Sequence, residues 1–150
     1  MQMLDFVILH EFSHAIQFWS NDWWAMSAIR RELKNVRHAE LVADCMSAAQ
    51  LGYQFRSYSD AIKQASIQGL LGAADSLADF EIDEFSHHGL PVERTLAVRM
   101  GLKKGLSYGT LYGITSKDIL DHCNTQVSIR DLIEGENKWT IQETDKVLGL

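Results

Sequence analysis

The chain has 150 residues, of which 46% are hydrophobic and 23% charged, with a single proline. This composition is typical of one globular domain and argues against disorder away from the chain ends. The net charge of −6 opposes binding to nucleic acid, and no apolar run reaches the roughly 20 residues of a transmembrane helix.

The first predicted element is a helix over residues 4–19. It is apolar on most sides, which predicts a central, buried helix. Residues 20–22 can end it and cap the next helix. From residue 23 to residue 55 only Gly52 interrupts the helical pattern, so we expect one helix, or two with a bend near Asn35.

The rest of the chain predicts further helices separated by loops. We expect these helices at residues 61–80, 92–106 and 117–124, with one or two short ones after residue 127. Residues that cap or open helices stand at their starts, namely Ser59, Asp60, Pro91, Thr115 and Ser116. No segment predicts a strand with confidence. The predicted fold is therefore mainly α, in a single domain over residues 1–150.

Cys45 and Cys123 form no CxxC pair, which argues against a thiolate zinc site. We expect two buried free thiols, with a disulfide between them as the alternative. The N-terminal stretch carries Asp5 and lacks both a basic segment and a cleavage site, so it predicts no signal peptide. A cytoplasmic location is expected, and a piece of a longer exported protein is the alternative.

Two histidines and a carboxylate stand in the apolar first helix, in the stretch HEFSH. His10 and His14 are four residues apart, so both project from one face of the helix and can bind one ion. Glu11 lies about 100° around the helix, where it can take a proton from a metal-activated water without being a ligand. This spacing is the HExxH signature of zinc peptidases.

A third ligand is predicted in the stretch HAELVADC, 26 residues after His14. The carboxylate of Glu40 is a suitable oxygen ligand for zinc. Asp44 lies one turn further on and can accept the free ring N–H of a zinc-bound histidine. His38 is the rival third ligand, but it has no matching partner of this kind.

These stretches resemble the neutral zinc metallopeptidases, relatives of the glutamate-zincins. In that family an HExxH helix precedes an ELxADC-like helix and an HGxxxxR-like stretch. The corresponding stretches here are HEFSHAIQ, AELVADCMSA and HHGLPVERTLAVRMGLKKG, spanning about residues 4–105. The resemblance implies a zincin-like domain, and because no segment predicts a strand we expect it to be helical here, with little or no sheet. It also implies a general base at Glu11, a supporting carboxylate at Asp44, and three zinc ligands: His10, His14 and Glu40.

The third stretch places His88 before a predicted helix. A histidine there can donate a hydrogen bond to the oxyanion of a tetrahedral intermediate. His88 is therefore a candidate catalytic residue, with His87 as its rival, and two ordinary loop histidines are the alternative. We expect Arg94 to form an ion pair with one of the preceding acidic residues, namely Glu81, Asp83 or Glu84.

The sequence thus predicts a zinc metallopeptidase that hydrolyses peptide or protein substrates by a zinc-activated water. Only nine residues precede His10, where family members carry a small sheet whose edge strand pairs with substrate. Residues 106–150 have no counterpart that we recognise. The alternatives are a catalytically silent or regulatory zinc-binding domain without a full substrate cleft, and a helical protein without metal.

Overall fold

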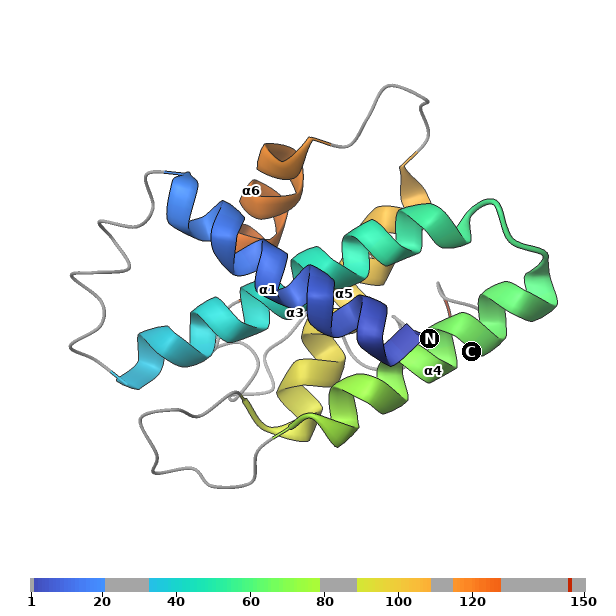
Figure 1. Ribbon diagram of the computed structural model, residues 1–150, viewed down its shortest axis with the longest axis horizontal. Coiled ribbons are helices and arrows are strands. Elements are labelled where there is room, and N and C mark those ends of the chain that lie inside the picture. Colours follow the sequence, from blue (N-terminus) through green and yellow to red (C-terminus); the bar gives the residue numbers. More distant parts are fainter. Residues whose placement is uncertain (1, 21–32, 79–88, 109–114, 128–145, 147–150) are drawn as a thin grey trace.

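The computed structural model describes residues 2–20, 33–78, 89–108, 115–127 and 146 (Figure 1). This part of the chain consists of helices and contains no strand. The helices are α1 (Gln2–Trp19), α3 (Leu33–Phe55), α4 (Asp60–Ser76), α5 (Pro91–Ser107) and α6 (Ser116–Gln126). The mainly α fold predicted from the sequence is confirmed. None of the described helices combines the length and the apolarity needed to cross a membrane.

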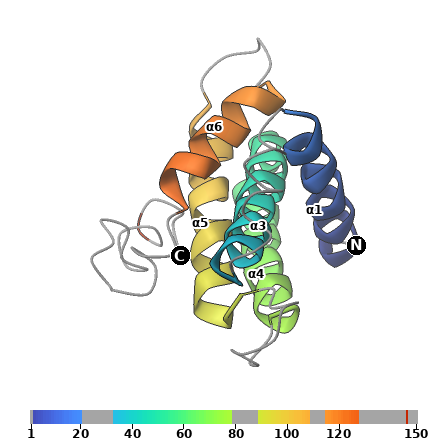
Figure 2. The same ribbon diagram turned by 90° about the vertical axis from the view of Figure 1, so that its left-hand side faces the viewer.

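Helix α3 is the central element. Figure 2 shows α1 on one side of α3 and α5 on the other. Residues 41–49 of α3 are all buried. Its contact with α5 is close because glycines face it. A Cβ placed on Gly101 would lie 2.0 Å from the carbonyl oxygen of Cys45, and one on Gly105 would lie 2.1 Å from that of Ala49. These glycines therefore let the two backbones approach each other.

Helix α1 is not the central, buried helix that its composition predicts. It packs along one face against α3 and α4, and it buries Phe6 and Ser13 there. The opposite face stays open, with Phe12 56% and Trp19 84% exposed. The prediction was wrong because an apolar composition does not say how many neighbours a helix has. Among the described helices, α3 takes the central place.

Two helix starts follow the sequence signals, whereas Ser59 precedes α4 without a side-chain capping hydrogen bond. Helix α5 opens at Pro91, and Thr115 caps α6, as predicted. Helix α4 ends at Ser76, earlier than predicted. The carbonyl oxygen of Leu77 accepts a hydrogen bond of 2.6 Å from Nη1 of Arg94. A partner outside the helix thus satisfies a carbonyl group at its end.

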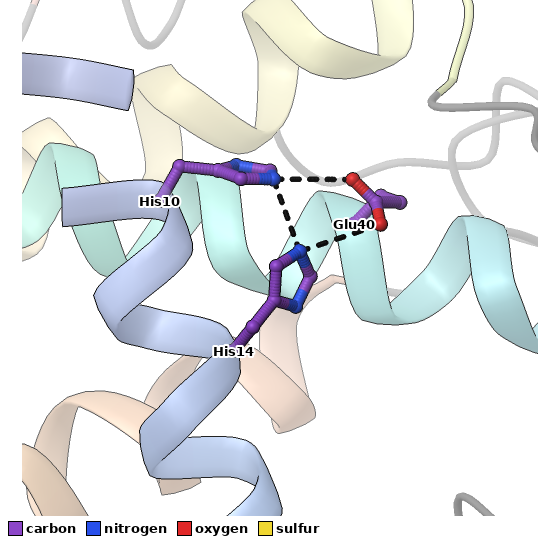
Figure 3. A group of neighbouring side chains, drawn as sticks. All are labelled: His10, His14 and Glu40. Carbon is purple, nitrogen blue, oxygen red and sulfur yellow. Dashed lines mark hydrogen bonds and ion pairs between the residues drawn. The ribbon is translucent and has the colours of Figure 1, made fainter. Parts of the chain in front are cut away.

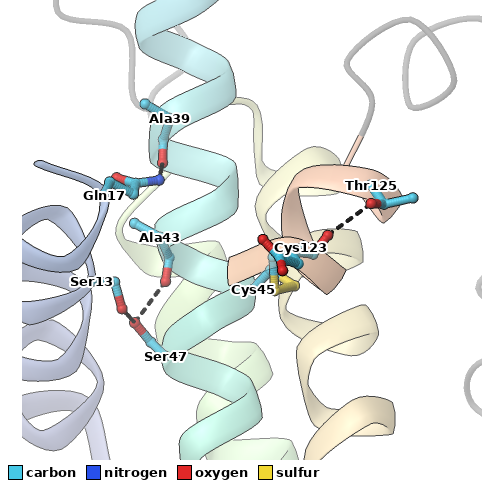
Figure 4. The surroundings of a disulfide bond; sticks show 9 residues. Ser13, Gln17, Ala39, Ala43, Cys45, Ser47, Cys123 and Thr125 are labelled. Atoms are coloured by element: carbon cyan, nitrogen blue, oxygen red, sulfur yellow. Dashed lines mark hydrogen bonds between the residues drawn. A yellow bond between two sulfur atoms is a disulfide. The ribbon is translucent and has the colours of Figure 1, made fainter. Parts of the chain in front are cut away.

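Cys45 and Cys123 form a disulfide between α3 and α6, with their Cα atoms 5.8 Å apart (Figure 4). Both residues are fully buried. The expectation of two free thiols is therefore wrong. The cysteines are separated by 78 positions, and only the packing of α6 against α3 brings them together.

Candidate metal centre

Helices α1 and α3 bring three potential metal ligands together (Figure 3). His10 and His14 project from the same face of α1, one turn apart, and Glu40 faces them from α3. The Nε2 atom of His10 lies 3.1 Å from Oε2 of Glu40, and Nε2 of His14 lies 3.3 Å from Oε1. The two Nε2 atoms are 3.1 Å apart. The predicted ligands therefore converge on one point.

The spacing of these atoms fits a bound metal ion. In a tetrahedral site with metal–ligand bonds of about 2.0–2.1 Å, neighbouring ligand atoms are about 3.3 Å apart. The three separations in the cluster are 3.1, 3.3 and 3.1 Å. The group of His10, His14 and Glu40 could thus hold a metal ion. His38, the rival third ligand, is not part of this group.

Hydrogen bonds on the far sides of the imidazoles fix their orientation. Nδ1 of His10 is 2.9 Å from Oδ1 of Asp44. Nδ1 of His14 is 2.8 Å from Oε1 of Gln17, whose Nε2 donates to the carbonyl oxygen of Ala39 at 3.0 Å (Figure 4). A carboxylate oxygen and an amide oxygen can only accept, so both Nδ1 atoms donate. In the neutral rings, both Nε2 lone pairs therefore point into the cluster.

The nearby carboxylates favour protonated imidazoles when no metal is bound. Burial disfavours the charged form of His10, but hydrogen bonds and charges from Asp44 and Glu40 outweigh it and raise the pKa of His10 to about 9. Burial and the charge of His10 lower the pKa of His14. Glu40 and Gln17 raise it by a larger amount, so the pKa of His14 lies above its ordinary value. A metal ion must therefore compete with protons for these nitrogens.

Asp44 accepts the hydrogen bond from His10 that its spacing predicted, and it is fully buried. It also accepts two hydrogen bonds of 2.7 Å from Arg94. Arg94 therefore pairs with Asp44. The acids predicted as its partners, Glu81, Asp83 and Glu84, lie outside the described residues, so a contact with them stays a prediction. The spacing of acids along the chain could not show that Asp44, 50 positions away, is the partner.

Glu11 lies beside the cluster without belonging to it. Its side chain is exposed, and it shares a pocket of about 180 Å³ with the potential ligand His10. The other residues that line this pocket are Phe6, Val7, Leu77 and Arg94. Glu11 and His10 therefore border the same pocket.

Gln17 belongs to the centre although no sequence pattern predicted it, and two predicted residues lie outside the described part of the chain. The position of Gln17, three residues after His14, could have indicated the contact. His88 and its rival His87 lie outside the described residues, so their suggested role in stabilising an oxyanion stays a prediction.

No family model, curated protein or solved structure matches the chain. The resemblance to neutral zinc metallopeptidases therefore depends on the three motif stretches alone.

Proposed function

We propose that this chain is a zinc-dependent metallopeptidase with a zincin-like site. One observation carries the proposal: two Nε2 lone pairs and a carboxylate converge at tetrahedral spacing, beside the exposed carboxylate of Glu11. Two imidazoles and one carboxylate are a common ligand set of catalytic zinc, which leaves the fourth position open for water or substrate. The side chain of His14 is 28% exposed, which supports access from solvent.

The roles of the residues follow from their positions. When bound, zinc would lower the pKa of a water molecule and polarise the scissile carbonyl group. Glu11 takes a proton from the attacking water and then passes it to the leaving amine. His10, His14 and Glu40 hold the metal, and Asp44 orients His10. The substrate is a peptide or a protein.

The disulfide bears on the compartment in which the protein works. Disulfides persist in oxidising compartments and are rare in cytosolic proteins. The buried bond between Cys45 and Cys123 therefore favours an exported protein over the cytoplasmic location expected from the sequence. Thiol titration of the denatured protein, purified from its native host without reductant, tests this: no free thiol is expected from this pair.

The proposed function is tested by comparing the wild type with Glu11→Gln and Asp5→Asn, all purified without chelator. Asp5 is the matched control because it is another exposed carboxylate on α1. We expect one zinc per chain in all three proteins. Casein hydrolysis should persist in Asp5→Asn and fall by a factor of about 10² or more in Glu11→Gln.

Each other result is informative. Zinc in the wild type without hydrolysis would support the silent or regulatory zinc-binding domain. Equal hydrolysis by the wild type and Glu11→Gln would contradict the role of Glu11 and point to a contaminating protease. A wild type that binds no zinc would support the alternative of a helical protein without metal.

A further inference from the structure

We propose that Arg94 is a positioning residue of the metal centre. It fixes the carboxylate of Asp44, which in turn holds His10 with its Nε2 atom directed at the metal position. The inference rests on the proposed zinc site, but it does not depend on peptidase activity.

The contacts of Arg94 are those of a fixed clamp. Its Nε donates to Oδ2 of Asp44 and its Nη2 donates to Oδ1, both at 2.7 Å. Its Nη1 donates to the carbonyl oxygen of Leu77 at 2.6 Å. Arg94 is only 4% exposed. Each nitrogen of the guanidinium group thus has an acceptor within the protein, and the group acts on the site through Asp44.

This clamp determines how His10 is presented. A carboxylate held by two parallel N–H groups cannot rotate about its terminal torsion without breaking a hydrogen bond. Oδ1 of Asp44 therefore stays 2.9 Å from Nδ1 of His10. Arg94 lies on α5 and Leu77 directly follows α4, so the orientation of this one ligand depends on both helices.

The second histidine ligand is anchored independently. Nδ1 of His14 is held by Gln17, which belongs to the same helix and binds the main chain of α3 at Ala39. Loss of Arg94 should therefore disturb His10 and leave His14 in place.

A neighbouring ion pair provides a matched control. Arg37 on α3 donates from Nε to Oε2 of Glu93 on α5 at 2.8 Å, and a second hydrogen bond joins Nη2 to Oε1. This pair joins the same two helices as the pair of Asp44 and Arg94, and Glu93 is 1% exposed. Among the contacts of the described residues, neither partner binds an imidazole. Loss of Arg37 should thus affect folding without affecting the presentation of His10.

The experiment measures the zinc dissociation constant of the full chain by competition with a chromogenic chelator. The proteins are the wild type, Arg94→Gln, Arg94→Lys, Arg37→Gln, Asp44→Asn and the double variant with Asp44→Asn and Arg94→Gln. Circular dichroism and thermal unfolding of each metal-free variant report the fold separately. Arg94→Lys keeps the charge but not the planar pair of donors, and it serves if Arg94→Gln does not fold.

We expect Arg94→Gln to weaken zinc binding about tenfold or more, as loss of groups that orient metal ligands does. Arg94→Lys should fall between it and the wild type, and Arg37→Gln should bind as the wild type does. The double variant should bind zinc as tightly as Asp44→Asn alone. In histidine ¹⁵N spectra of the zinc-loaded protein, only the Arg94 and Asp44 variants should lose the single Nε2-coordinated form of His10.

The proposal is overturned if the Arg94 variants bind zinc as tightly as the wild type does. It is also overturned if Arg37→Gln weakens zinc binding as much as Arg94→Gln does, or if the double variant loses the affinity that Asp44→Asn and Arg94→Gln lose separately, added together. A wild type without zinc affinity would instead refute the zinc site itself. Zinc binding without hydrolysis would refute only the peptidase function.

Discussion

Zinc and protons compete for His10. We therefore predict that a rise in pH lowers the stability of the metal-free protein and strengthens the binding of zinc. In the metal-free protein, the carboxylates of Asp44 and Glu40 raise the pKa of His10 from 6.5 to about 9. A group with a raised pKa in the folded state stabilises the protein fully below its unfolded pKa. That contribution is lost as the pH rises through the folded pKa. The metal-free protein should therefore lose stability between pH 6.5 and pH 9.

The size of this loss follows from the shift itself. A pKa that rises from 6.5 to about 9 corresponds to a free energy of about 3 kcal/mol. Zinc has the opposite dependence, because its binding requires an unprotonated Nε2 and releases the proton of His10. The apparent dissociation constant for zinc should therefore fall at least about tenfold per pH unit over most of this interval, because the pKa of His14 is raised as well and zinc also displaces its proton.

Urea unfolding followed by tryptophan fluorescence measures both effects, with the disulfide kept intact. One series contains a chelator and the other contains zinc. His10→Gln in chelator is the control, because it lacks the titrating group and keeps the other pH-dependent groups. If the metal-free wild type and His10→Gln change in parallel between pH 6.5 and pH 9, the argument from the two carboxylates is wrong.

Two further predictions concern the scaffold around the centre. Gly101→Ala should destabilise the protein by about 1–3 kcal/mol in urea unfolding, because the added Cβ would lie 2.0 Å from the carbonyl oxygen of Cys45. Gly72→Ala is its control, because a Cβ there meets nothing within 4 Å. Helix propensity should make this variant more stable by up to about 1 kcal/mol. An equal loss of stability in both variants would contradict the close packing of α3 and α5. Cys123→Ser should lower the unfolding free energy by up to about 4 kcal/mol, because the disulfide closes a loop of 78 residues. Unchanged unfolding of Cys123→Ser under oxidising conditions would show that the bond does not form.

Much of the candidate centre could be predicted because its geometry is local to single helices. A spacing of four residues places His10 and His14 on one face of a helix, whatever the rest of the chain does. The same rule places Asp44 one turn after Glu40. The mainly α class was predictable for the same reason, because cap residues and apolar periodicity act over a few residues.

Contacts between distant segments could not be predicted in this way. Arg94 binds Asp44 across the interface of α5 with α3, and no local rule relates two residues that are 50 positions apart. The cysteines were expected to be free, although packing of α6 against α3 joins them. The apolar composition of the first helix predicted a central, buried place for it, although this helix exposes Phe12 and Trp19.

The sequence by itself determined which side chains share a helix face, because that depends only on the period of the helix. Tertiary structure decided which faces meet: α1 against α3, so that two imidazoles face Glu40, and α5 against α3, so that a guanidinium reaches Asp44. The physical reason is that burial of apolar surface has no direction of its own. Glycines such as Gly101, which allow a close approach, and polar groups that must find partners when buried select one packing from many.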